Sequence, residues 1–112
     1  MQNKTYPGSI IVICAYRPKP GKEDDLLAIV KEHVPILRSI GLATERIPCI
    51  MKAGSGTIVE VFEWVSSKAI EEAHTNPVVL EMWNKFNICS DPVNLSDLDE
   101  AKHPYSDFQP IN

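Results

Sequence analysis

The segment Thr57–Val65, which reads TIVEVFEWV, constrains the fold more than any other part of the chain. Its β-branched and aromatic residues favour an extended backbone. Both alternating sets of side chains are apolar. One set contains Ile58, Phe62 and Trp64, and the other contains Val59, Val61 and Val65. A strand with this pattern is typical of a sheet that is covered on both faces.

Two more strands are predicted before this one. Ser9–Arg17 is almost continuously apolar, which again indicates a strand with both faces covered. Thr44–Lys52 is a second candidate, and Pro48 inside it favours an edge position or a bulge because proline donates no backbone hydrogen bond. A turn with two glycines at 53–56 joins this candidate to Thr57–Val65 as a hairpin.

Two helical regions are predicted around these strands. The first begins at Lys22, carries acids in its first turn that suit the positive end of the helix dipole, and runs to about Ser39. The second divides into Lys68–His74 and Pro77–Asn87, because Asn76–Pro77 is a typical helix start. The residues expected to face the core are Leu26, Val30, His33 or Val34, and Leu37 in the first region, and Val79, Trp83 and Phe86 in the second.

The order of these elements predicts an α+β fold. With a short final strand or turn over Val93–Leu98, it matches the ferredoxin-like βαββαβ sandwich with a four-stranded antiparallel sheet. The 112 residues show no shift in composition, so a single domain 1–112 is expected, with its core over about residues 9–95. Helices cover one face of such a sheet. The apolar second face therefore predicts a homodimer with two sheets packed face to face, extended by the tail 96–112.

Composition excludes several classes of function. The formal charge is −4 and the basic residues form no run, which argues against a nucleic-acid partner. Ile10–Tyr16 is the longest apolar run and is too short to cross a bilayer, and Met1–Gly8 lacks the blocks of a signal peptide, so a cytoplasmic protein is expected. The three cysteines are expected to be buried thiols, and no histidine spacing predicts a metal site.

A family resemblance rests on residues from about 9 to 90. The pattern consists of Ile11–Tyr16, Pro20–Gly21–Lys22 opening a helix, Glu60–Ser66 with Ala69 and His74 behind it, and then Asn76–Pro77 and Trp83. This pattern resembles that of the antibiotic biosynthesis monooxygenase-like proteins. These belong to the dimeric α+β barrel superfamily. The resemblance implies a homodimer and, for some members, oxygenation of aromatic substrates without a cofactor. Other members are isomerases, haem-degrading enzymes or proteins of unassigned role.

Two departures from this family limit what the resemblance implies. Its haem-degrading members carry an asparagine on the first strand, and Ile10–Arg17 contains none. We therefore expect no haem, and the resemblance to the cofactor-independent monooxygenases implies no other bound cofactor. The segment Asp91–Asn112 has no clear counterpart in the compact monooxygenases.

Glu60 and Glu63 are the acids most relevant to catalysis. Strict alternation along the strand places them on opposite faces of the sheet, so at most one can face the helices. A buried Glu60 is a candidate general base. The alternative is a structural ion pair of Glu60 with Arg46 or Lys52 of the neighbouring strand.

His33 and His74 are the other candidates for an acid or base. His74 either interacts with the end of its helix or meets a ligand carbonyl or phenol, as the resemblance implies. His33 either is satisfied by a backbone group in the core or joins His74 in one cavity between sheet and helices. Tyr16, Phe62, Trp64 and Trp83 are the candidate walls of a pocket for an aromatic ligand, or are simply core residues.

Two functions remain open from the sequence. One is a small-molecule enzyme that resembles cofactor-independent monooxygenases and acts on an aromatic or carbonyl substrate. The other is a non-catalytic homodimer that binds a small ligand or serves as an accessory protein. Histidine or glutamate side chains that reach a ligand-sized cavity would favour the first, and an apolar pocket with no acid or histidine inside would favour the second.

Overall fold

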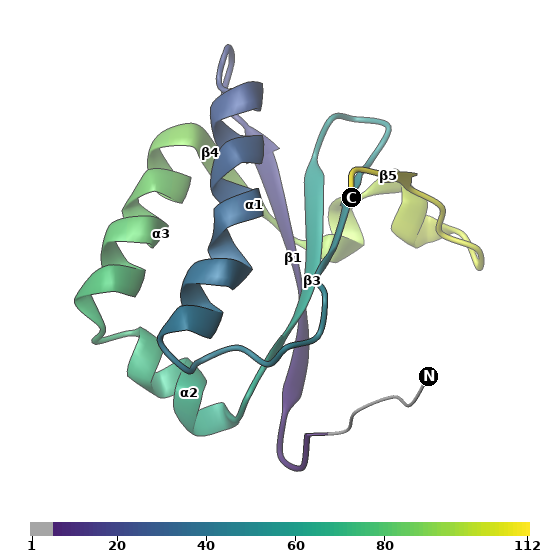
Figure 1. Cartoon of the computed structure of the whole chain (residues 1–112). Helices are drawn as coiled ribbons and strands as arrows, with labels where there is room; N and C mark the ends of the chain where they lie inside the picture. The colour runs from purple at the N-terminus through teal and green to yellow at the C-terminus, as the bar shows by residue number, and fades with distance from the viewer. Residues whose placement is uncertain (1–5) are drawn as a thin grey trace.

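The computed structural model describes residues 6–112, so the part of Met1–Gly8 before Tyr6 lies outside the described residues. The chain forms a mixed α+β structure with an antiparallel sheet and helices on one of its faces (Figure 1). The strand order is β4-β1-β3-β2-β5. The strands are β1 Ile10–Pro18, β2 Cys49–Lys52, β3 Ile58–Trp64, β4 Ser90–Val93 and β5 Gln109–Pro110.

Within residues 6–112 the sheet has five strands, which corrects the prediction of four. The additional strand is β5 from the tail, which pairs with Met51 and Lys52 of β2. β2 itself begins only after Pro48, as expected from the missing donor of proline. Val93–Leu98 was predicted as a short final strand or turn. The last strand of the predicted four, β4, ends at Val93, and the 3-10 turn η1 (Leu95–Asp97) follows, so the turn is the alternative that the structure has there.

Three helices cover one face of the sheet: α1 Glu23–Ser39, α2 Ser67–Ala73 and α3 Pro77–Cys89. The side chains of Ser66 and Asn76 accept backbone N–H groups at the starts of α2 and α3, which removes unsatisfied donors there. In α1 every predicted inward residue is buried, including both His33 and Val34. In α3 the prediction was partly wrong, since Met82 rather than Trp83 is buried beside Val79 and Phe86.

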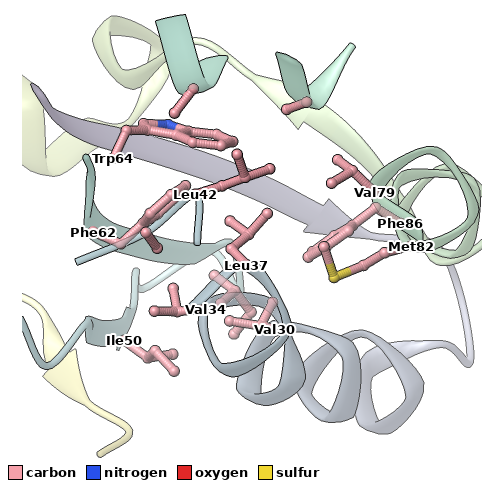
Figure 2. Close-up of a cluster of buried hydrophobic side chains, with 14 of the residues drawn as sticks. Val30, Val34, Leu37, Leu42, Ile50, Phe62, Trp64, Val79, Met82 and Phe86 are labelled. Atoms are coloured by element: carbon pink, nitrogen blue, oxygen red, sulfur yellow. The ribbon is translucent and has the colours of Figure 1, made fainter. Parts of the chain in front are cut away.

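The main hydrophobic core lies between the helices and the sheet (Figure 2). Val30, Val34 and Leu37 of α1 meet Phe62 of β3 and Phe86 of α3 there. Full burial of each such side chain stabilises the fold by roughly 1.5–3 kcal/mol. Within residues 6–112, no helix combines the length and apolar character needed to cross a membrane.

The second face of the sheet is covered in part by the chain's own tail. Leu98 is buried against Ala15 and Val59, and Phe108 packs on the same cluster. The packed part of the chain therefore extends beyond residue 95. The tail was predicted to extend a dimer interface, and here it packs on its own sheet. It leaves Ile11 and Ile13 of β1 54% and 51% exposed.

Candidate functional site

A buried cluster of three polar side chains lies inside the main core. Nδ1 of His33 is 2.8 Å from Oε1 of Glu60, and the Tyr16 hydroxyl donates a hydrogen bond of 3.0 Å to the same oxygen. Glu60 is 0% exposed and His33 is 3% exposed. A carboxyl group this deeply buried is costly unless its oxygens are hydrogen-bonded, so this cluster requires an explanation beyond packing.

The sheet register and the helical repeat bring these three residues together. Glu60 stands at the middle of β3 opposite Cys14, and Tyr16 is two residues further along β1 on the same face. His33 belongs to the buried face of α1 and points at that face of the sheet. Glu60 thus lies on the helix side, which answers the question that the alternation left open.

Aromatic rings enclose the His33 imidazole. Phe62 and Phe86 each contact it edge-on, with ring centroids 5.0 Å away. Phe86 also stacks on Tyr16 at 4.7 Å, and Trp64 lies 5.3 Å from Phe62. The predicted wall residues Tyr16 and Phe62 therefore contact the acid and the histidine in an environment that excludes water, and Trp64 packs against Phe62.

Two atoms of the cluster have no hydrogen-bond partner within the described residues: Nε2 of His33 and Oε2 of Glu60. An ionised carboxylate only accepts hydrogen bonds, so Nδ1 of His33 donates to Glu60, and in the neutral ring the lone pair is then on Nε2. Burial raises the pKa of Tyr16 well above its usual range, and the Glu60 carboxylate raises it further. Tyr16 therefore remains a neutral donor. The arrangement leaves His33 able to accept a proton at Nε2.

Sequence reasoning missed Cys14 and the role of Phe86 in this cluster. Cys14 lies on the same face of β1 as Tyr16 and directly opposite Glu60, and burial is the main cause that raises the pKa of its thiol. Alternation along Ser9–Arg17 places Cys14 on the same face as Tyr16 and was the signal that could have found it. Phe86 was predicted to be inward, but its contact with a histidine depends on how α1 and α3 pack together.

Glu63 occupies the opposite face and is fully paired. It accepts hydrogen bonds from the hydroxyls of Thr44 at 2.7 Å and Ser9 at 2.9 Å, and from Nε of Arg46 at 3.1 Å. The Thr44 bond, followed by those of Ser9 and Arg46, lowers the pKa of Glu63 against the opposing effect of burial. The alternative that paired Glu60 with Arg46 was wrong, because Arg46 belongs to Glu63.

His74 lies away from this cluster. It is exposed, and its Nδ1 donates to the backbone oxygen of Ile70 at 2.7 Å. Its ring contacts Trp83, which is half-buried, at 5.2 Å. The expectation that His33 and His74 share one cavity was wrong, because one ring is enclosed by the core and the other lies on the surface of α2 and α3.

A cavity of about 420 Å³ lies next to the cluster, between the start of α1 and one end of the sheet. Leu27 and Ile58 contribute to its apolar lining, and Arg17 and Lys52 are among its charged residues. Its lining does not include the predicted wall residues Tyr16, Trp64 and Trp83, nor His33 or Glu60. The predicted pocket and the predicted catalytic groups are thus neighbours rather than one space.

The described residues give no indication of a metal site. No group of three or more histidine, cysteine, aspartate or glutamate side chains within 6–112 is arranged to hold a metal ion. The three cysteines are free thiols. Cys89 is buried, but Cys14 is half-buried and Cys49 is exposed on β2, which corrects the expectation that all three are buried.

Comparison with known proteins supports the fold alone. No family model matches the chain, and no curated protein matches it. Among solved structures, Rv0793 from Mycobacterium tuberculosis is similar, with a TM-score of 0.59 and 20% sequence identity. The match covers 83% of this chain and 98% of Rv0793. The arrangement of helices and strands is therefore found in another protein, while the remainder of this chain is additional to it.

Proposed function

We propose that this chain is a small-molecule enzyme that removes a proton from an aromatic or carbonyl substrate without a bound cofactor. His33 is the base and Glu60 orients it. The observation that carries the proposal is the buried His33–Glu60 pair with Nε2 of His33 left unpartnered. A histidine whose other nitrogen is held by a carboxylate is a common arrangement for general base catalysis.

Nε2 of His33 is buried, so the proposed reaction requires the core side chains around it to open to the substrate. It then begins with transfer of a proton to this nitrogen. The proton comes from a phenolic O–H or from a C–H beside a carbonyl group, and the electron pair of that bond stays on the substrate. The resulting imidazolium is stabilised by the Glu60 carboxylate 2.8 Å away. Aromatic rings around the pair keep water away, which strengthens this interaction.

Two outcomes follow from the same carbanion. Return of the proton to a different carbon gives an isomer. Addition of dioxygen at the carbon, followed by return of the proton, gives a hydroperoxide that loses water and leaves a new carbonyl group. The net change at a CH₂ carbon is then consumption of one dioxygen and release of one water. The resemblance to the antibiotic biosynthesis monooxygenase-like proteins favours the second outcome.

The proposed assembly is a homodimer with the ferredoxin-like arrangement of a dimeric α+β barrel. The order β4-β1-β3-β2 with helices on one face supports this arrangement. Ile13, Val61 and Cys49 form one row on the second face of the sheet, and Ile13 is 51% exposed. A second copy placed on this face would bury the row. The free thiols support a cytoplasmic location, where cysteines stay reduced.

Deuterium exchange tests the proposed chemistry without knowledge of the natural substrate. Phenols and enolisable aryl ketones are incubated with the protein in D₂O, and the loss of the C–H signal is followed by proton NMR. The wild type should accelerate exchange of at least one compound, and His33→Gln and Glu60→Gln should lower that rate by about 100-fold or more. His74→Gln is the matched control and should keep the rate, because His74 is exposed and contacts Ile70 and Trp83 rather than the pair.

Exchange at the buffer rate across the panel, or an unchanged rate in folded His33→Gln, would contradict the proposal. Near-ultraviolet circular dichroism checks that each variant keeps its aromatic core. Exchange at the buffer rate across the whole panel would favour the second candidate, a non-catalytic protein that binds a small ligand. That candidate is supported by the cavity of about 420 Å³, whose lining does not include His33 or Glu60.

A further inference from the structure

The cavity beside the cluster has an apolar interior and a charged mouth. It is formed where the end of β1, the start of α1, the β2–β3 turn and the C-terminal residues meet. Leu27, Ile58 and Ile111 supply the apolar lining, while Arg17 and Lys52 supply positive charge. Its volume of about 420 Å³ is that of a site for a small organic ligand.

The cavity is adjacent to the His33–Glu60 pair along both elements that carry the pair. Ile58 precedes Glu60 by two residues on the same face of β3, a distance of roughly 7 Å. Leu27 precedes His33 by six residues on α1, a rise of about 9 Å. Tyr16, which is bonded to Glu60, stands directly opposite Ile58 in the sheet register. A ligand bound in the cavity therefore lies one row of side chains from the base.

The charges around the mouth favour an anion. Arg17 and Lys52 are exposed, and within residues 6–112 neither forms an ion pair or a side-chain hydrogen bond. Glu23 and Asp24 also line the cavity, but they occupy the first turn of α1, where the helix dipole offsets negative charge. The two cations are left to attract a ligand.

We propose that this cavity binds small aromatic carboxylates, with the carboxylate at Arg17 and Lys52 and the ring on Leu27 and Ile58. The ring then points toward Tyr16 and the His33–Glu60 pair. This assignment names the substrate class of the proposed enzyme and rests on that function for its role in the reaction. The binding itself is independent of catalysis and is tested separately.

The test is a titration of the protein with sodium benzoate, followed by methyl NMR. Benzoate should shift the methyl signals of Leu27, Ile58 and Ile111 and should bind more tightly than benzyl alcohol or benzylammonium. Lys52→Gln should weaken benzoate binding by about three- to five-fold, the size expected for one exposed ion pair. The double variant Arg17→Gln/Lys52→Gln should weaken it by about tenfold or more. Lys68→Gln on α2 makes the same change in net charge away from the cavity and should have no effect.

Three results would overturn the assignment: no shift of these methyl signals with benzoate, binding of benzylammonium as tight as that of benzoate, or equal weakening by Lys68→Gln. Benzoate has no C–H beside a ketone, so the titration reports binding alone. Loss of benzoate binding together with deuterium exchange that depends on His33 would remove the substrate class and leave the proposed function. Benzoate binding without such exchange would keep the ligand class of the cavity and remove the proposed catalytic function.

Discussion

The His33→Leu variant should have a free energy of unfolding that is lower by about 3–5 kcal/mol than that of the wild type, the cost of leaving one partner of a buried pair alone. Leucine fills much of the same space, so lost packing is a minor cause. Glu60 would be left fully buried with Tyr16 as its remaining hydrogen-bond donor among the described side chains. Urea unfolding followed by tryptophan fluorescence measures the change.

A double variant separates a functional pair from a structural one. His33→Leu/Glu60→Leu removes both polar groups, and replacement of buried pairs by apolar residues is often neutral or stabilising. We expect it to recover at least about half of the stability lost in His33→Leu, since the buried carboxylate is gone. His103→Leu, in the exposed tail, is the control and should change stability by less than about 0.5 kcal/mol. A double variant less stable than His33→Leu would indicate that the pair holds the fold together.

The Ile13→Glu variant should convert the proposed dimer to a monomer. Ile13 lies at the β1 end of the row Ile13, Val61 and Cys49 on the second sheet face and is 51% exposed, and two-fold symmetry would place the new charge twice in the interface. Each charge would be buried without a partner, so the dimer dissociation constant should rise by at least about 100-fold. Sedimentation equilibrium at micromolar concentrations measures this directly.

Ile88→Glu is the matched control for the dimer. Ile88 lies on α3 and is 55% exposed, close to the value for Ile13, but it belongs to the helix layer rather than to the second sheet face. It should leave the dimer intact. A wild-type protein that sediments as a monomer at micromolar concentration would contradict the proposed assembly, and so would equal dissociation by both variants.

Local patterns predicted much of the fold. The 3.6-residue repeat of α1 identified each of its buried residues, including His33. Strict alternation in β3 placed Glu60 and Glu63 on opposite faces, and both are indeed buried there. These predictions held because they depend only on the geometry of a single helix or strand.

Contacts between distant segments could not be predicted in the same way. The partner of Glu60 is 27 residues away on a helix, and the choice between His33 and Arg46 depends on how α1 lies across the sheet. Met82 is buried where Trp83 was predicted to be, for a similar reason: a small rotation of α3 decides which side chain enters the core. Strand β5 is only two residues long and carries no periodic signal.

The protonation of His33 tests the central claim most directly. Nitrogen-15 NMR of the folded wild type at neutral pH distinguishes a ring protonated at Nδ1 alone from one protonated at Nε2 or at both nitrogens. We expect a neutral His33 with its proton on Nδ1, bound to Glu60, and a free lone pair on Nε2. A His33 protonated at Nε2 would have no lone pair there for a substrate proton and would contradict its proposed role as the base.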